Sequence, residues 1–113
     1  MGREYRYTIR NLNEESSLIN TEILNYRIEG MSMYPTLDHN EIVAVYPKEV
    51  YGLNDVIAFK QGQKLYVKRI TAVDGNRLWV ESDNQDIPTV DSNVFGWIST
   101  NSVIGVVQCE RIV

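Results

Sequence analysis

The clearest pattern in this chain is the alternation of apolar and polar residues, and it predicts strands. In residues 4–10, Tyr5, Tyr7 and Ile9 occupy one face and charged or polar residues occupy the other, which is typical of a half-buried strand. Residues 18–23 could instead form one face of a short helix. Similar short apolar runs recur along the whole chain. The expected strands are residues 4–10, 24–29, 41–46, 54–60, 64–73, 77–81, 94–98 and 102–113.

Turn signals separate these runs and indicate how the strands are connected. Asp74-Gly75 is a strong hairpin signal, and the polar residues 61–63 suit a second hairpin. Between two earlier strands, Asn40 can take the left-handed conformation that a tight turn requires. Residues 82–93 are polar and contain Pro88, so we expect a loop. Many short strands at regular spacing predict a mainly β fold of strands and hairpins, in a barrel-like or sandwich arrangement.

The length of the chain fits one domain. Its 113 residues can build a modest core and are too few for two domains. We expect a single domain over residues 1–113, with an N-terminal strand and arm in residues 1–24 and the core in residues 25–113. No apolar run approaches the roughly 18 residues of a membrane span, so we expect a soluble, cytoplasmic protein.

Charge and cysteine content argue against several function classes. The net charge is −4 and no basic stripe is visible, so this segment is not expected to grip a nucleic-acid backbone. The single cysteine, Cys109, cannot form an internal disulfide, and it cannot make a metal site by itself. It lies in a run rich in valine and isoleucine, where a free cysteine usually behaves as a small buried apolar residue.

Candidate chemistry centres on Ser32, which follows a predicted strand and a glycine. Gly30 permits the backbone conformations of a sharp turn, and Pro35 prevents the segment after the serine from simply continuing as a helix. A serine held in this way becomes a good nucleophile only when a base lies within hydrogen-bond reach. The alternative is that its hydroxyl satisfies amide groups of the turn.

Two residues could supply that base. His39, the only histidine, lies in a turn and has no partner motif, so a surface role fits it as well. Lys68 lies beside Arg69 on a predicted strand of which neither face is plainly the solvent face. Burial would lower the pKa of a lysine and make its neutral amine a proton acceptor, whereas arginine stays protonated. The alternative for Lys68 is a stem along apolar surface with its ammonium in water.

Three motifs in order give the chain a resemblance to a known superfamily. They are Gly-Met-Ser-Met-Tyr-Pro-Thr-Leu at 30–37, Tyr-Val-Lys-Arg-Ile at 66–70 and Ser-Asp-Asn at 82–84. From about Tyr26 to Val107, the chain resembles the serine-lysine peptidase superfamily, which contains the LexA-like repressors of the S24 family and the type I signal peptidases.

This resemblance implies a chemistry as well as a largely β fold. It implies that Ser32 is the nucleophile and Lys68 the general base, with an oxyanion hole formed partly by backbone amides around Met31 and Ser32. It also implies cleavage of a peptide bond without histidine, metal or cofactor. The family's usual Gly-Asp pairs are replaced by Asn40-Glu41 and Asn54-Asp55, and asparagine can still take the left-handed conformation.

The two branches of the superfamily imply different substrates. Lys68 follows Ser32 by 36 positions (68 minus 32), which resembles the repressor branch. That branch implies a self-cleaving peptidase and dimerisation domain of a transcriptional regulator, whose substrate is its own linker and whose DNA contact lies in a separate domain. A homodimer is expected, through an exposed edge of the C-terminal strand.

Two alternatives stay open. Asp83-Asn84 followed by Asp91-Ser92 also resembles the type I signal peptidases, which implies an endopeptidase acting at a membrane, although these residues could simply cap loops. The Ala-Gly or Cys-Gly bond at which repressors usually cleave themselves does not occur in this sequence. A catalytically silent dimerisation domain is therefore the third interpretation.

Overall fold

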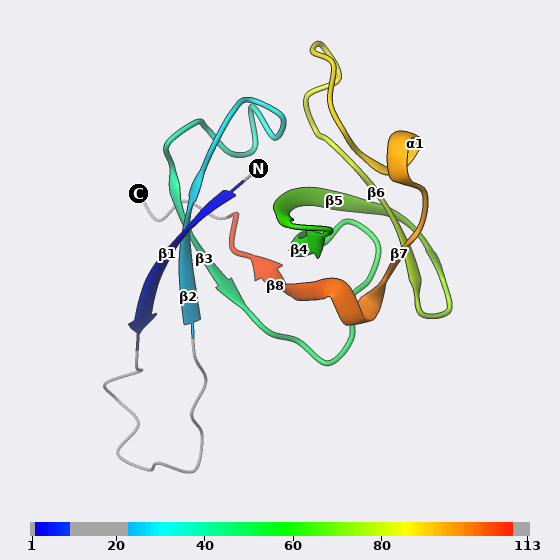
Figure 1. Cartoon of the computed structure of the whole chain (residues 1–113), viewed down its shortest axis with the longest axis horizontal. Helices are drawn as coiled ribbons and strands as arrows, with labels where there is room; N and C mark the ends of the chain where they lie inside the picture. The colour runs from blue at the N-terminus through cyan, green and yellow to red at the C-terminus, as the bar shows by residue number, and fades with distance from the viewer. Residues whose placement is uncertain (1, 10–22, 110–113) are drawn as a thin grey trace.

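The computed structural model describes residues 2–9 and 23–109, and these residues form many strands and little helix (Figure 1). A four-residue helix, α1 (Ser92–Phe95), follows β6, and a 3₁₀ turn, η1 (Thr100–Ser102), precedes β8. The short helix considered for residues 18–23 falls almost entirely outside the described residues. The strands are β1 (Gly2–Ile9), β2 (Ile23–Ile28), β3 (Ile42–Tyr46), β4 (Val56–Gln61), β5 (Lys64–Asp74), β6 (Arg77–Glu81), β7 (Ile98–Ser99) and β8 (Val103–Val107).

The strands of the described residues form one sheet, in the order β1-β2-β3-β8-β4-β5-β6-β7. Every neighbouring pair is antiparallel. In Figure 1, β1 to β3 lie on one side and β5 to β7 on the other, with β4 and β8 joining them. The predicted mainly β fold is confirmed. The sheet stays open, because β1 and β7 are its edges and do not pair with each other.

Both faces of β5 are buried around Lys68. Val67 belongs to one hydrophobic cluster, whereas Tyr66 and Ile70 belong to the other. Because successive residues of a strand point to opposite faces, Lys68 shares the buried face of Tyr66 and Ile70. The prediction that one of the two adjacent cations approaches apolar surface is confirmed, since Lys68 is only 1% exposed.

The prediction of a strand over residues 94–98 is wrong for most of that range. Residues 92–95 form α1, and only Ile98 enters β7. The Asp91 side chain accepts a hydrogen bond of 2.9 Å from a backbone amide in the first turn of α1. Gly96 ends the helix with a φ of 80°, in the range that favours glycine. These capping interactions decide the local structure, although the sequence shows apolar alternation.

The C-terminal strand is shorter than predicted, and it is interior. Ser102 belongs to η1 and β8 ends at Val107, while residues 110–113 lie outside the described residues. β8 pairs with β3 on one side and with β4 on the other, so the exposed edge expected to form a dimer is not offered by β8. Gly105 makes this interior position possible, because a Cβ there would lie 2.6 Å from the carbonyl oxygen of Tyr46.

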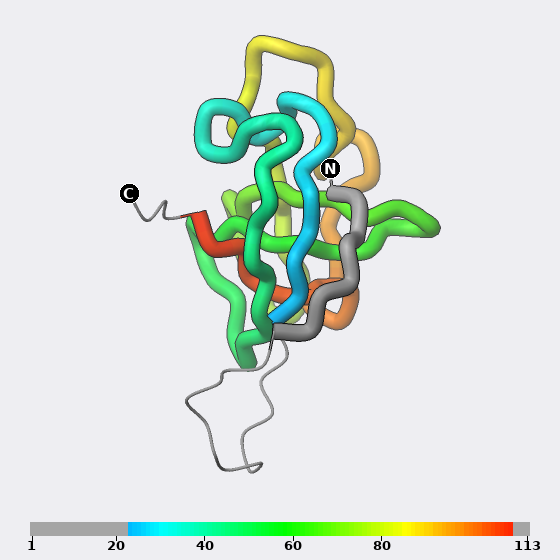
Figure 2. Tube along the Cα trace, turned by 90° about the vertical axis from the view of Figure 1, so that its left-hand side faces the viewer, coloured from blue at the N-terminus to red at the C-terminus, as the bar shows by residue number. Residues whose placement is uncertain are grey.

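The turn after β2 and the loop after β6 lie at the same end of the molecule. The two perpendicular views agree on this placement, with the turn in cyan and the loop in yellow (Figures 1 and 2). A hydrogen bond from the Asn84 side chain to the Met31 carbonyl joins them. The three sequence motifs therefore meet, because the turn carries the first, the loop carries the third, and Lys68 and Arg69 of the second donate hydrogen bonds to that loop.

Candidate active site

Ser32 lies in a tight turn directly after β2. Gly30 opens the turn with a φ of 86°, a left-handed conformation that favours glycine. The amide of Asn40 donates a 2.8 Å hydrogen bond to the Ile28 carbonyl and closes the base of the turn. Asn40 itself has a φ of 71°, as the turn pattern predicts. Met33 is fully buried, so the segment that carries Ser32 is anchored in the core.

His39 has a structural role in the same turn. Its Nδ1 atom accepts a 2.8 Å hydrogen bond from the Gly30 amide, and its side chain is exposed. This contact supports the interpretation of His39 as a surface turn residue. Lys68 remains as the candidate base.

Lys68 lies on β5 with its side chain almost completely enclosed. Its Nζ atom donates a 2.7 Å hydrogen bond to Ser82 Oγ and lies 5.9 Å from the centre of the Tyr66 ring. Burial lowers the pKa of Lys68 below its usual value of 10.5, and the charge of Asp91 opposes that shift in part. Burial acts in this direction because it disfavours the charged ammonium. A neutral amine at Lys68 is therefore reached at lower pH than in a lysine exposed to water.

The structure brings Ser32 and Lys68 to one pocket of about 260 Å³. Residues 29–31, Lys64, Tyr66 and residues 87–90 also line it. Among residues 23–109, no hydrogen bond joins Ser32 to Lys68, because the lysine amine is directed to Ser82. The two candidate residues thus share a cavity and are not in direct contact.

Residues 82–84, directly after β6, contact both candidate residues. Ser82 accepts the hydrogen bond from Lys68. The amide of Asn84 donates to the Ser32 carbonyl at 2.9 Å, and its side-chain Nδ2 donates to the Met31 carbonyl at 2.9 Å. This loop therefore fixes the position of the Ser32 turn relative to the strand that carries Lys68.

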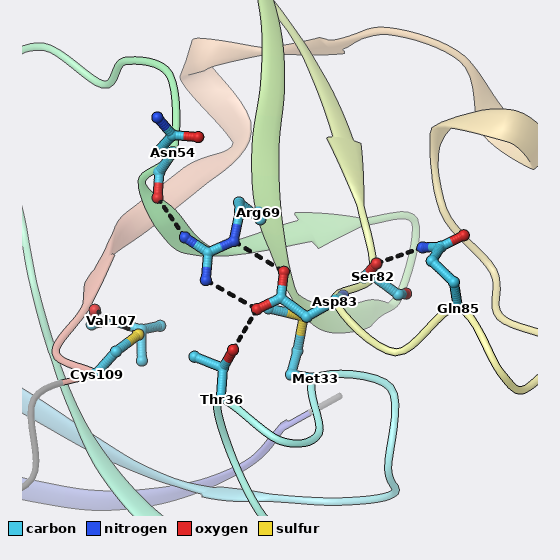
Figure 3. A network of polar contacts seen from close by, with 9 residues as sticks. All are labelled: Met33, Thr36, Asn54, Arg69, Ser82, Asp83, Gln85, Val107 and Cys109. Atoms are coloured by element: carbon cyan, nitrogen blue, oxygen red, sulfur yellow. Dashed lines mark hydrogen bonds and ion pairs between the residues drawn. The ribbon is translucent and has the colours of Figure 1, made fainter.

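Asp83 ties the same loop to β5 and to the Ser32 turn (Figure 3). Arg69 donates to it from Nε to Oδ1 and from Nη2 to Oδ2, each at 2.8 Å, and Thr36 donates its hydroxyl proton to Oδ2. Arg69 also donates from Nη1 to the Asn54 carbonyl at 2.8 Å. Burial by itself would raise the pKa of Asp83, but the hydrogen bonds from Arg69 and Thr36 lower it below its usual value. The adjacent cations thus differ in role, since Lys68 faces the pocket and Arg69 holds the loop.

Comparison with known families agrees with this geometry. The model of the Peptidase S24-like family matches residues 4–108. The chain belongs to the Peptidase S24-like family. A search of the curated proteins found no match. In this S24-like domain, the Ser32 turn, the Lys68 strand and the loop at 82–84 all lie within the matched region.

Sequence reasoning missed the contacts made by Ser82 and Arg69 in this S24-like domain. The available signal was the polar Ser-Asp-Asn run that begins where β6 ends. The sequence allows Asp91 to be a residue that caps a loop. It caps α1 and its charge also acts on Lys68.

The described residues contain neither a cluster of metal-binding side chains nor a helix that could span a membrane. In the described ranges 2–9 and 23–109, no group of three or more His, Cys, Asp or Glu residues is placed to hold a metal ion. The same ranges contain no helix long and apolar enough to cross a membrane.

Proposed function

We propose that this S24-like domain is a serine endopeptidase with a Ser32–Lys68 dyad. Ser32 Oγ is the nucleophile and the neutral amine of Lys68 is the general base. The observation that carries the proposal is that both residues line one pocket in which the lysine is 1% exposed. Enclosing a lysine costs free energy, and such groups concentrate at sites of chemistry.

The proposed reaction needs one proton acceptor and one oxyanion donor. Lys68 Nζ takes the hydroxyl proton of Ser32 as Oγ attacks the peptide carbonyl carbon, and the resulting ammonium gives that proton to the leaving amine. A water molecule then repeats the cycle and releases the acyl group. The Ser32 amide makes no hydrogen bond to the protein within residues 23–109, which supports it as an oxyanion donor. Rotation of the Ser32 side chain toward Nζ precedes the first step.

For the whole protein, we propose a cytoplasmic LexA-like or phage-repressor-like transcriptional regulator, of which this chain is the peptidase and dimerisation domain. The 36 positions from Ser32 to Lys68 (68 minus 32) support this branch. The substrate is then the protein's own linker, and the active form is a homodimer. DNA contact belongs to a separate domain, which agrees with a net charge of −4 in this chain.

Covalent labelling tests the proposed nucleophile. A penem or a peptide phosphonate is expected to acylate or phosphonylate Ser32, because the Lys68 amine activates that hydroxyl. Intact mass and peptide mapping locate the adduct, and Ser32→Ala is expected to take up none. Ser99 is an exposed serine outside the pocket. The variant Ser99→Ala is therefore a matched control and should be labelled as the parent chain is. If Ser32 stays unlabelled and no peptide of a degenerate library is cleaved, the peptidase proposal is refuted and the interpretation as a catalytically silent dimerisation domain takes its place.

Ser82→Ala tests the contact that positions the base. The substitution is expected to lower kcat for peptide hydrolysis about 10-fold, because Lys68 loses the hydrogen bond that orients its amine. KM should change little, since Ser82 is not part of the pocket wall. Steady-state kinetics on a cleaved peptide separates the two constants. A rise in KM with unchanged kcat would show that Ser82 acts on substrate binding and does not position Lys68.

A further inference from the structure

β5 has an open edge beside the candidate active site. Over its first five residues, Lys64 to Lys68, one edge pairs with β4, whereas β6 joins the other edge only from Arg69 onward. Within residues 2–9 and 23–109, no strand is hydrogen-bonded to that second edge, and β1 approaches β5 without pairing with it. Unpaired backbone groups of this kind can accept an extended peptide as an added strand.

Three alternate residues of β5 line the pocket, namely Lys64, Tyr66 and Lys68. Alternate residues of a strand share a face and lie about 6.6 Å apart, so the backbone of Lys64 is roughly 13 Å from that of Lys68. Lys68 is 1% and Tyr66 7% exposed, whereas Lys64 is exposed to solvent. The pocket therefore extends from an enclosed amine to an exposed ammonium at its outer end.

Lys64 makes no ion pair with a carboxylate within residues 23–109. In the same part of the chain, Lys48, Arg69 and Arg77 each pair with an aspartate. Glu29 lines the same pocket, yet it forms no salt bridge with Lys64. The ammonium of Lys64 is thus a positive charge on the pocket wall that the described protein does not neutralise.

We infer that Lys64 is a specificity-determining residue, which favours peptides with an aspartate or glutamate about four residues from the cleaved bond. The inference rests on the proposed peptidase function. A peptide strand added to β5 has the same residue spacing, so the side chain opposite Lys64 lies four positions (68 minus 64) from the one beside Lys68. An exposed ion pair of this kind changes affinity about 2- to 5-fold, and salt screens it.

Cleavage-site profiling of a degenerate peptide library tests the inference on the full 113-residue chain. Mass spectrometry of the products gives the residues around each cleaved bond. Acidic residues should be enriched over lysine about 5-fold at one position four residues from the bond, and the enrichment should fade at about 0.5 M salt. Lys64→Glu is expected to invert the preference. Lys60→Glu makes the same charge change at an exposed position of β4 outside the pocket, and it should keep the preference.

The outcomes separate the two proposals. Cleavage with the same profile in the parent chain and in Lys64→Glu would overturn the role of Lys64 and leave the peptidase function standing. If no peptide is cleaved, the binding of degenerate peptides containing aspartate or lysine is compared in Ser32→Ala and in the Ser32→Ala, Lys64→Glu double variant. If the preference for aspartate inverts in the double variant, Lys64 selects acidic peptides, and the absence of cleavage refutes the proposed peptidase function. Binding without a charge preference, or no binding, would overturn the inference.

Discussion

Lys68→Arg is expected to abolish peptide hydrolysis, with a loss of at least about 1,000-fold in kcat/KM. The guanidinium keeps the positive charge but stays protonated, so it cannot take the proton from Ser32. Lys68→Met should lose the same activity and remain folded, because methionine fills a similar volume without a buried amine. Peptide hydrolysis and thermal unfolding measure the two effects. Lys60→Arg, at an exposed position outside the pocket, should retain full activity.

The pH dependence of the unmodified protein tests the same assignment. Because burial lowers the pKa of Lys68 from 10.5, the neutral amine forms at lower pH than in a free lysine. The value of kcat/KM should rise with pH and level off above the pKa of Lys68, with a midpoint below 10.5. Activity that falls as pH rises through this range, or that survives in Lys68→Arg, would show that another group accepts the proton.

Folding stability should change over the same pH range with a definite sign. Between the lowered pKa of Lys68 in the folded chain and about 10.4 in the unfolded chain, the unfolded chain binds a proton that the folded chain does not. The free energy of unfolding therefore rises with pH in this window, and the gain is lost as pH falls through the folded pKa. Chemical denaturation should show this rise in the parent chain and not in Lys68→Met.

Local pattern was sufficient for most strands, and for Lys68 it left two environments open, an enclosed amine or an ammonium in water. Apart from β7, the strands were predicted from apolar and polar positions within their own few residues. Two apolar faces on one strand indicated that Lys68 or Arg69 approaches apolar surface, but not that Lys68 is the enclosed cation. The helix α1 was missed because four residues are too few to show a helical period. Its caps, Asp91 and Gly96, are residues that are equally common in loops. The interior place of β8 was missed because it depends on pairing with strands far away in the sequence.

The contact between Ser82 and Lys68 depends on an irregularity that the sequence does not reveal. The pairing of β5 with β6 shifts by one residue between Ile70 and Ala72. If β5 and β6 paired from the Asp74-Gly75 turn onward without this shift, Ser82 would lie opposite Arg69. The bulge places it beside Lys68, at a hydrogen-bond distance of 2.7 Å. The bulge thus decides whether Lys68 or Arg69 lies opposite Ser82. The sequence could therefore predict which residues belong to the site but not which of them are in contact.

Asp83→Ala is expected to lower the free energy of unfolding by about 2 to 3 kcal/mol. The substitution removes two of the three hydrogen bonds that the Arg69 guanidinium donates, and the side chains of Asp83 and Arg69 are only 14% and 30% exposed. Asp74→Ala is a matched control, because Asp74 at the end of β5 pairs with Arg77 at the start of β6 at side-chain exposures of 61% and 53%. That exposed pair should contribute less than about 1 kcal/mol. Denaturant unfolding of the parent chain and both variants measures the difference.

Lowering the pH should reduce the difference in the free energy of unfolding between the parent chain and Asp83→Asn. Burial raises the pKa of Asp83, but the hydrogen bonds from Arg69 and Thr36 outweigh it, and the folded pKa lies below its usual value. The stabilisation is therefore complete above the unfolded pKa of about 3.9 and is lost as pH falls through the folded pKa. The amide of Asp83→Asn does not titrate, so the difference in the free energy of unfolding between the two chains should begin to shrink below about pH 4 and vanish once the pH is below the folded pKa of Asp83. A difference that stays constant on acidification would mean that the size and shape of Asp83, and not its charge, hold the loop against β5.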